Sequence, residues 1–361
     1  MKFVIAAGGT GGHVYPALSV ARALAPHAVV FVGTRQGPEA EIVPQAGFSL
    51  RTIPARKLDR RLGPGALWSL AVSAGGVVSA VRLLRAERAQ AVLGTGGYAA
   101  APVVFAAWLL RLPVAILEGD AHPGRANRLL GRLARRVFLA TAAAQAHFPA
   151  GCTVVTGLPI RLEIARGDGV GFRRLHGLDP ARRLLFLFGG SRGAQRLNTA
   201  LIDALPALAA AGIQIVHQTG KENYESVRGQ IAPGEEWPAG YVPVPYVEDM
   251  AGALAAADLV VCRAGSSTLA EVTAAGKPAI LVPYPYAVGD HQTHNARALV
   301  DAGAAVLVPD RELDGARLAS EVGALLADGE RRTRMAAASL ALGRPDAAAR
   351  VAVELVQIAG K

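Results

Sequence analysis

Short apolar runs alternate with stretches of helical periodicity along most of the chain, and this alternation constrains the fold more than any other feature. A first set of strand-like runs covers residues 3–6, 29–32, 91–93, 114–117, 137–139 and 153–155, and a second covers residues 184–188, 213–218, 259–262, 279–282 and 305–308. Alternation of this kind is typical of parallel sheets covered by helices on both faces. The sequence therefore predicts an α/β protein.

The pattern begins again near the middle of the 361-residue chain, which is long enough for two domains of ordinary size. Each half opens with a strand, a glycine turn and a helix, and the second opening covers residues 186–195. The domain boundary is expected near residues 157–161. Two doubly wound domains facing a central cleft would bind ligands there, outside the carboxyl ends of their strands.

The first glycine turn reads AAGGTGGH, with four glycines among residues 8–12 and His13 at the start of a helix. Backbone N–H groups of such a turn can approach an anion at the helix N-terminus. A structural turn without a ligand is the alternative. A dinucleotide fingerprint is excluded, because Val14 stands where the third glycine belongs and the strand at residues 27–32 ends without an acidic residue.

Composition limits the class of protein and its partners. With 52% hydrophobic and 18% charged residues the chain is not disordered, and no apolar run reaches the length that spans a membrane. The net charge of +10 suits an anionic partner, and much of it lies in the first half. Aromatic residues make up only 5%, and no nucleic-acid module is present, so no nucleic-acid partner is expected. A solvated basic face remains the alternative for each cluster of charges.

Two cysteines, Cys152 and Cys262, lie in or beside apolar runs without the spacing of a metal site. This usage fits a reducing cytoplasm, and the N-terminus has no signal peptide. Two histidines at three-residue spacing, His291 and His294, lack a third ligand, and the chain contains no Asp-x-Asp sequence. No bound metal is therefore expected.

The segment CRAGSSTLAE runs from a strand through a Gly-Ser-Ser turn into a helix that carries Glu271. Hydroxyl groups at a helix start suit a phosphate, and a carboxylate in the first turns suits ribose hydroxyls. The alternative is a capping box, in which Ser267 or Thr268 begins the helix and Glu271 bonds back to it.

Several short motifs together resemble the MurG family of GT-B glycosyltransferases, over essentially the full length of the chain. They are Gly8 to His13 with Pro16, Gly94 to Tyr98, Gly189 to Ala194, Tyr246 to Met250, Cys262 to Glu271, and Asp290 to Gln292 with Asn295. The resemblance implies transfer of N-acetylglucosamine (GlcNAc) from UDP-GlcNAc to the 4-hydroxyl of a lipid-linked muramoyl-pentapeptide, with inversion, in peptidoglycan synthesis. Two Rossmann-like domains are implied: residues 1–161 for the acceptor, with a helix at 343–361 that packs back on them, and residues 162–342 for the donor.

The resemblance also assigns roles to individual residues. In the first domain it places Thr10, Gly11 and Gly12 against the acceptor diphosphate, and His13 as the base. Asn127 would hold the neighbouring loop. In the second domain it places the backbone at Val247 against uracil and Glu271 against ribose. Arg161 would complete the donor site, and Gln292 would bind the GlcNAc hydroxyls. The remaining donor contacts are Ser191, Met250, Ser266, Ser267, Thr268, Leu269 and Ala270. For His13, the alternatives to the base role are that it only caps its helix or only hydrogen-bonds the acceptor.

The chain departs from the family pattern at two places. It reads Glu118-Gly-Asp120 where the family has Glu-Gln-Asn, and Leu158 where the family has asparagine. Asp120 adds a second possible base beside His13, and Glu118 is placed in the same catalytic group. Alternatives therefore remain: another UDP-sugar enzyme of this architecture, such as a UDP-GlcNAc epimerase or a glycolipid transferase, or a binding protein without turnover.

The family is peripheral on the cytoplasmic face of the cell membrane. Basic and apolar residues at 60–68 and 70–85 could rest on anionic lipid there. The alternative is that the helix from about residue 67 packs against the first sheet.

Overall fold

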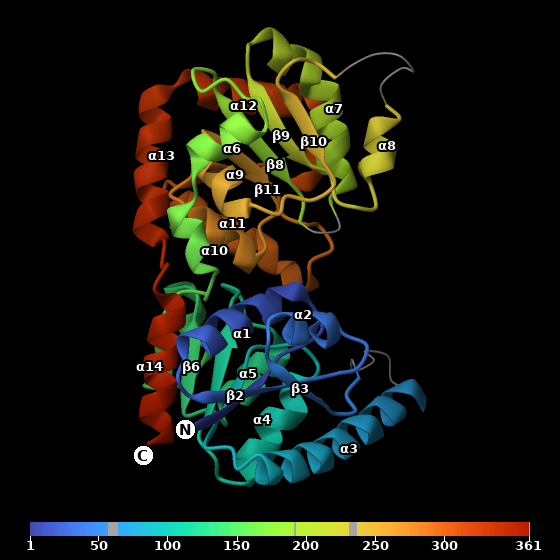
Figure 1. The fold of residues 1–361 in the computed structure, drawn as a ribbon, viewed down its shortest axis with the longest axis vertical. Helices are drawn as coiled ribbons and strands as arrows, with labels where there is room; N and C mark the ends of the chain where they lie inside the picture. Colours follow the sequence, from blue (N-terminus) through green and yellow to red (C-terminus); the bar gives the residue numbers. More distant parts are fainter. Residues whose placement is uncertain (57–63, 191–192, 231–236, 361) are drawn as a thin grey trace. The chain divides into compact units, whose positions relative to one another are not determined.

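The computed structural model describes residues 1–56, 64–190, 193–230 and 237–360, with only the helical backbone for residues 64–71. The chain divides into two compact units (Figure 1). Unit 1 comprises Met1–Arg161 with Arg344–Lys361, and unit 2 comprises Leu162–Gly343. Each unit is described by itself below, so the cleft expected between them stays a prediction.

Unit 1 contains a parallel sheet of seven strands in the order β3-β2-β1-β4-β5-β6-β7. The strands are β1 (Lys2–Ala6), β2 (Ala28–Gly33), β3 (Ser49–Thr52), β4 (Ala91–Gly94), β5 (Val114–Glu118), β6 (Arg136–Leu139) and β7 (Thr153–Val155). The order reverses between β1 and β4. Ala6 pairs with Gly94, so the loops that follow these two strands leave the sheet at the same level. Such a reversal is where doubly wound sheets bind ligands.

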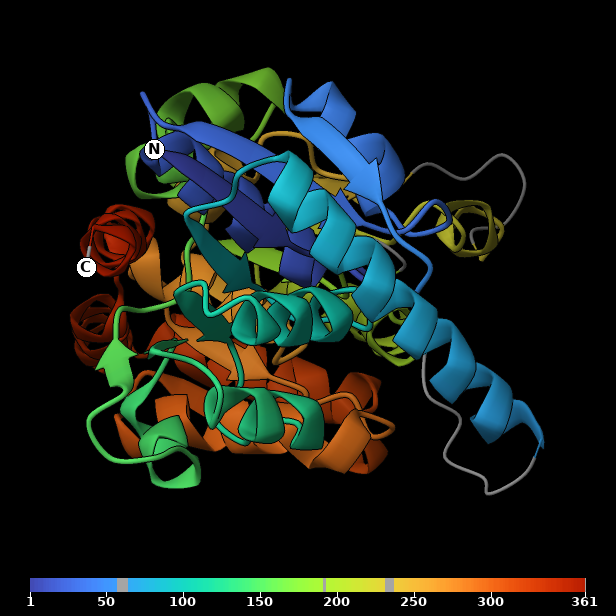
Figure 2. The same cartoon turned by 90° about the horizontal axis from the view of Figure 1, so that it is seen from below.

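The helices of unit 1 are α1 (Gly11–Ala23), α2 (Glu39–Gln45), α3 (Pro64–Ala86), α4 (Ala100–Leu109), α5 (Arg125–Gly131) and α14 (Ala347–Ala359). The last of them packs on α1, and Glu354 of α14 pairs with Arg136 at 3.4 Å. Figure 2 shows α3 lying beside α4, against which it packs. Ala80 and Leu84 of α3 are buried in the core of this unit, as expected for a helix that covers the sheet.

Unit 2 contains a second parallel sheet, of six strands in the order β10-β9-β8-β11-β12-β13. The strands are β8 (Leu184–Phe188), β9 (Gln214–Gln218), β10 (Tyr241–Val244), β11 (Leu259–Cys262), β12 (Ala279–Leu281) and β13 (Ala305–Leu307). The helices are α6 (Gly169–Leu175), α7 (Gln195–Ala210), α8 (Tyr224–Arg228), α9 (Met250–Ala256), α10 (Ser266–Ala274), α11 (His291–Asp301), α12 (Gly315–Ala327) and α13 (Gly329–Leu342). Here the order reverses between β8 and β11.

The prediction of an α/β fold with parallel sheets is confirmed, whereas β3 and β10 were not expected from the sequence. Both lie at the edge of their sheets. No residue of β3 is buried, and only Tyr241 of β10 is. β3 reads SLRT and has no continuous apolar run, whereas β10 reads YVPV, in which Pro243 argues against a strand.

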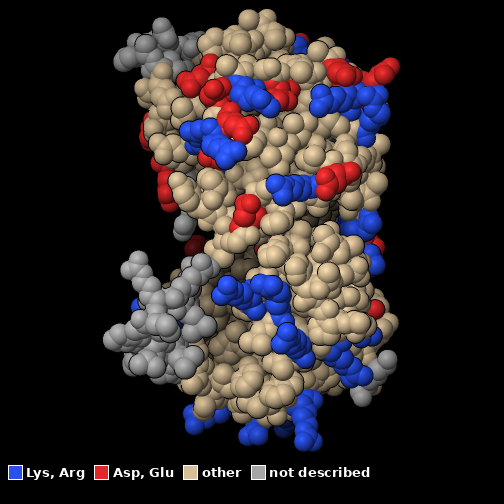
Figure 3. All heavy atoms as spheres, turned by 180° about the vertical axis from the view of Figure 1, so that it is seen from behind, with Lys and Arg blue, Asp and Glu red and all other residues tan. Residues whose placement is uncertain are grey.

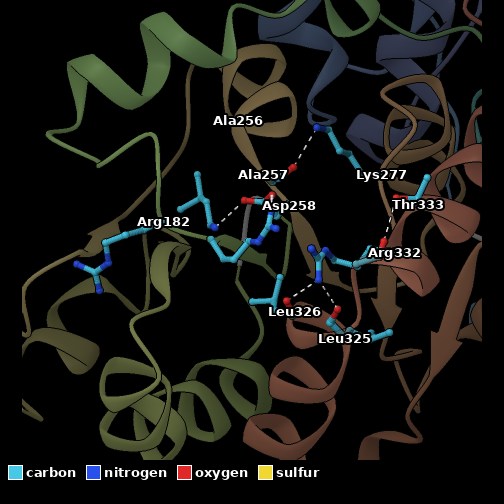
Figure 4. A network of polar contacts seen from close by, with 12 residues as sticks. Arg182, Ala256, Ala257, Asp258, Lys277, Leu325, Leu326, Arg332 and Thr333 are labelled. Atoms are coloured by element: carbon cyan, nitrogen blue, oxygen red, sulfur yellow. Dashed lines mark hydrogen bonds and ion pairs between the residues drawn. The ribbon is translucent and has the colours of Figure 1, made fainter.

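Ion pairs and hydrogen bonds to carbonyl oxygens stabilise unit 2 near the amino end of β11 (Figure 4). Asp258 accepts hydrogen bonds from Arg173 at 2.9 Å and from Arg183 at 3.0 Å. Lys277 donates to two carbonyl oxygens at the end of α9, and burial lowers the pKa of its ammonium group. Arg332 donates to two carbonyl oxygens at the end of α12. Each of these cations serves the structure, because a helix C-terminus binds positive charge.

Candidate active site

The loop that follows β1 sets the orientation of His13. Thr10 is the N-cap of α1, so His13 lies inside the first helical turn and does not cap it. Its ring atom Nδ1 lies 3.0 Å from the carbonyl oxygen of Gly8. Because a carbonyl oxygen only accepts, Nδ1 must carry the proton. In the neutral ring the lone pair is then on Nε2, which is the form that a general base requires.

The loop that follows β4 packs on the same imidazole ring. Gly96 and Gly97 have φ angles of +107° and +81°, which favour glycine. A Cβ atom at Gly96 would lie 2.8 Å from Cδ2 of His13, so the ring fits only because this residue has no side chain. Thr95 donates from its hydroxyl to the carbonyl oxygen of His13 at 3.0 Å. The two glycine loops of unit 1 therefore form one site around the histidine.

Several groups act on the protonation of His13. Burial lowers its pKa below the ordinary value of 6.5. The hydrogen bond to Gly8 and the charges of Asp120 and Glu39 act in the opposite direction and favour the imidazolium. Since burial has the largest effect, the ring is neutral at pH 7 and able to accept a proton.

Glu118 is the last residue of β5, and Asp120 follows that strand at the same end of the sheet. Glu118 is 4% exposed, and its oxygens accept from the backbone N–H of Asp120 and from the side-chain amide of Asn127, both at 2.9 Å. The carboxylate of Glu118 thus ties the loop to α5, while Asp120 lies close enough for its charge to act on His13. The catalytic role expected for Glu118 stays a prediction.

Unit 2 presents a helix start at the corresponding reversal of its own sheet. The N-cap of α10 is Gly265, and no side chain caps the helix, so the capping box considered for Ser267, Thr268 and Glu271 is not formed. A helix directs the N–H groups of its first turn out of its N-terminus, and here that turn begins at Ser266. Leu269 is buried and donates its N–H to the carbonyl of Gly265 at 3.0 Å.

The motif that begins α11 clamps the turn before α10. The side-chain oxygen of Gln292 accepts from the backbone N–H groups of Ala264 at 3.1 Å and Tyr284 at 2.9 Å. Asn295 donates to the carbonyl oxygen of Ala264 at 3.3 Å. Because two donors fix the side-chain oxygen of Gln292, the direction of its NH₂ group is fixed as well.

A glutamine on β9 fixes the segment before α9. Gln218 accepts from the N–H of Val247 at 2.9 Å and donates to the carbonyl of Gly190 at 3.1 Å. The N–H of Val247 is therefore used within the protein, and its carbonyl is the group left for a ligand. Asp249 caps α9, and Met250 begins that helix with 8% of its surface exposed.

The other expected site residues are placed as follows. Ala270 and Glu271 lie on α10, both half-buried, and Arg161 is the last residue of the first segment of unit 1. Ser191 lies outside the described residues. Within the described part of the chain, no group of three His, Cys, Asp or Glu residues is placed to hold a metal ion, His291 and His294 included.

Sequence reasoning missed Glu39 as part of this site. Its carboxylate is completely buried below the first glycine loop. A single acidic residue near a helix start is usually solvated, so nothing in the sequence marked Glu39 as a site residue. Thr95, Gly96 and Tyr98 were noted only as part of a family motif, although a second Gly-Gly turn after a strand is the signal that marks them.

Comparison with known proteins defines the class. The model of the glycosyltransferase family 28 N-terminal domain matches residues 3–139, and that of the C-terminal domain matches residues 184–351. A UDP-N-acetylglucosamine--N-acetylmuramyl-(pentapeptide) pyrophosphoryl-undecaprenol N-acetylglucosamine transferase from Desulforudis audaxviator is 43% identical over 371 residues, which covers 100% of this chain and 99% of the relative.

Solved structures agree. The crystal structure of Acinetobacter baumannii MurG matches with a TM-score of 0.80 and 32% identity, covering 99% of both chains. A UDP-GlcNAc 2-epimerase from Neisseria meningitidis covers 99% of this chain with a TM-score of 0.69 but only 13% identity, so it shares the fold alone. The chain belongs to the MurG family of glycosyltransferases.

The charge of Asp120 predicts a measurable effect on His13. Replacing Asp120 by Asn removes a negative charge that favours the imidazolium, so the pKa of His13 should fall further below 6.5. An NMR titration of the His13 ring measures this shift. Asp301→Asn, on exposed α11 of unit 2, is the control and should leave the titration unchanged. An unchanged or higher pKa in Asp120→Asn would show that the two groups do not interact.

Proposed function

We propose that this glycosyltransferase moves GlcNAc from UDP-GlcNAc to the 4-hydroxyl of a lipid-linked N-acetylmuramoyl-pentapeptide, in peptidoglycan synthesis. The observation that carries the chemistry is the His13 ring, which is held by Nδ1 on the Gly8 carbonyl and is neutral at pH 7. The full-length likeness to transferases of this name supports the choice of substrates.

In the proposed reaction, Nε2 of His13 takes the proton of the acceptor hydroxyl. The hydroxyl oxygen then bonds to the anomeric carbon of GlcNAc as the bond from that carbon to UDP breaks, with inversion. Thr10, Gly11 and Gly12 at the start of α1 bind the acceptor diphosphate, because a helix N-terminus attracts an anion. Asp120 supports the imidazolium that forms.

The donor is bound by unit 2 in this proposal. The carbonyl of Val247 accepts from uracil, since its N–H is already used by Gln218. Glu271 accepts from the ribose hydroxyls, and the oriented NH₂ group of Gln292 donates to a hydroxyl of GlcNAc. The first turn of α10, at Ser266 to Thr268, binds the donor diphosphate.

The leaving UDP gains negative charge, which the N-terminus of α10 and Arg161 would stabilise. Preorganised donors of this kind can take the place of a divalent cation. We therefore propose transfer without a metal or other cofactor, in line with the lack of an Asp-x-Asp sequence.

The test is transfer of labelled GlcNAc to a short-chain lipid-linked muramoyl-pentapeptide in EDTA. His13→Ala should lower kcat by about 10²- to 10⁴-fold, as loss of a general base does, with little change in the KM for UDP-GlcNAc. His27→Ala, at a half-buried histidine of the same unit, is the matched control and should retain activity. Full activity of His13→Ala would contradict the role of this residue.

The same assay tests the donor site. Glu271→Ala should raise the KM for UDP-GlcNAc by about tenfold or more, because hydrogen bonds to a charged group are lost. Glu330→Ala, at an exposed position, is its control. Tight binding of UDP-GlcNAc without transfer would contradict the proposed acceptor or the proposed turnover. Formation of UDP-N-acetylmannosamine would indicate an epimerase.

We further propose that unit 1 rests on an anionic membrane surface. Arg125 and Arg128 of α5 and its C-cap residue Arg132 line a cavity of about 420 Å³ together with Leu129 and His147. Within the described part of the chain these three arginines form no ion pair. Like charges at this spacing on one helix destabilise it, so the cluster suits an external anion.

Exposed apolar residues lie on the neighbouring helix, α4, which contacts α5. Phe105 stacks on Trp108 with ring centroids 5.6 Å apart, and Trp108 and Leu109 are 45% and 51% exposed. On the face shown in Figure 3, described charges of unit 1 are mainly basic, whereas unit 2 carries both signs. Apolar side chains beside arginines are typical of an interfacial surface. The expected segment at residues 60–68 lies outside the described side chains.

The described helices include none that is long and apolar enough to cross a bilayer, so attachment would depend on this surface. The double variant Arg128→Glu, Arg132→Glu should bind vesicles containing phosphatidylglycerol at least about tenfold more weakly, since each basic residue contributes about 1 kcal/mol near such a surface. Transfer to a short-chain acceptor in solution should not change. Arg331→Glu in unit 2 is the control. Unaltered vesicle binding by the double variant would contradict the proposed surface.

A further inference from the structure

Glu39 is a buried carboxylate that the proposed reaction does not use. It is 0% exposed, at the start of α2. Its Oε1 accepts from the N–H of Thr34 at 2.9 Å and from the Thr34 hydroxyl at 2.7 Å, and its Oε2 accepts from the N–H of Gly9 at 3.2 Å. All three partners are neutral donors. A buried charge without a cation is costly, so such a group at a site suggests a function.

The protein leaves room for this carboxylate by placing glycines around it. A Cβ atom at Gly8 would lie 2.6 Å from Oε1, and one at Gly33 would lie 2.5 Å from Cγ of Glu39. Gly37 is similarly close. Part of the glycine content near the first loop therefore serves Glu39 and not an approaching ligand.

One peptide unit joins Glu39 to His13. The N–H of Gly9 donates to Glu39, and the carbonyl of Gly8, which belongs to the same peptide, accepts from Nδ1 of His13. A trans peptide is planar, so its N–H and C=O point in opposite directions and holding one orients the other. Hydrogen bonds in such a chain also polarise one another.

We propose that Glu39 is the orienting carboxylate of His13 and acts through the Gly8–Gly9 peptide. This inference rests on the proposed function of His13 as a base. Glu39 is a positioning residue: it fixes the peptide, the peptide fixes Nδ1–H, and Nε2 is left to accept the proton of the acceptor hydroxyl. It touches neither substrate.

A second contact extends the network to the other glycine loop. Because the Thr34 hydroxyl donates its only proton to Glu39, its oxygen can accept from the Tyr98 hydroxyl, which lies 3.3 Å away. The ring of Tyr98 also lies under Gly9. Glu39 thus connects both loops that surround His13.

The charge of Glu39 also reaches the histidine. Groups that act on His13 from the packed elements are the Gly8 carbonyl, Asp120 after β5 and Glu39 of α2. A negative charge favours the imidazolium, so removing it lowers the pKa of the ring and weakens the base.

The test compares Glu39→Gln with Glu41→Gln, an exposed residue of the same helix with the same loss of charge. In Glu39→Gln the side-chain NH₂ faces the N–H of Gly9, so the peptide loses its acceptor. We expect kcat to fall about 10- to 100-fold from misplacement of the base, with the KM for UDP-GlcNAc unchanged. The acid limb of the pH profile of kcat/KM should move to lower pH. Glu41→Gln should match the wild type in kcat, in the KM for UDP-GlcNAc and in the position of the acid limb.

Thr34→Val separates the effect of the hydrogen bonds that hold the Glu39 carboxylate from the effect of its charge. It removes one donor to Oε1, so the carboxylate holds the Gly9 N–H less firmly and kcat should fall by less than in Glu39→Gln. The charge stays in place, so the acid limb should not move. An unchanged acid limb in Glu39→Gln, or an equal shift in Glu41→Gln, would overturn the proposal.

Two measurements need no substrate, so their results do not depend on whether the proposed function is correct. An NMR titration of the His13 ring should give a lower pKa in Glu39→Gln than in wild type. If that variant does not fold, hydrogen exchange of the wild type decides: the N–H of Gly9 should be protected from exchange although its loop is half-exposed. A Gly9 N–H that exchanges as freely as an unstructured amide would overturn the proposal.

Discussion

The hydrogen bond from Nδ1 of His13 to the carbonyl of Gly8 is the interaction on which the proposed role of His13 depends. It fixes the tautomer, because a carbonyl oxygen cannot donate. Burial then keeps the ring neutral at pH 7, and the fixed tautomer leaves Nε2 as the acceptor. The Gly96 backbone packs on the same ring, and the Glu39 carboxylate accepts from the N–H of the peptide that carries the Gly8 carbonyl.

The parallel sheets determine where such a site can form. In each unit the strand order reverses once between neighbouring central strands, β1 and β4 in unit 1 and β8 and β11 in unit 2. The loops that leave the sheet at a reversal diverge to opposite faces and open a space at the carboxyl ends. His13 lies at the first reversal and the start of α10 at the second. At the amino end of β11, Asp258 instead forms ion pairs with two arginines of the same unit.

The sequence predicted the central strands and the two glycine loops, because buried parallel strands are continuous apolar runs and strand-to-helix turns need glycine. The edge strand β3 has no such run, and the run of the edge strand β10 is interrupted by Pro243. Predicted site residues such as His13 and Gln292 do lie at loop and helix starts. The hydrogen bonds between side chains and distant segments could not be predicted from the sequence. They are the bond from the Val247 N–H to Gln218, the bond from Asn127 to Glu118, and the bond from the Gly9 N–H to Glu39. These depend on distances between segments far apart in the chain.

The central claim is that His13 is a neutral imidazole protonated on Nδ1. A ¹⁵N NMR spectrum of the histidine-labelled protein at pH 7, assigned by comparison with His13→Ala, distinguishes the tautomers through the shifts of the two ring nitrogens. The account predicts a protonated Nδ1 and an unprotonated Nε2 for His13. A proton on Nε2, in either the other tautomer or the imidazolium, would contradict it.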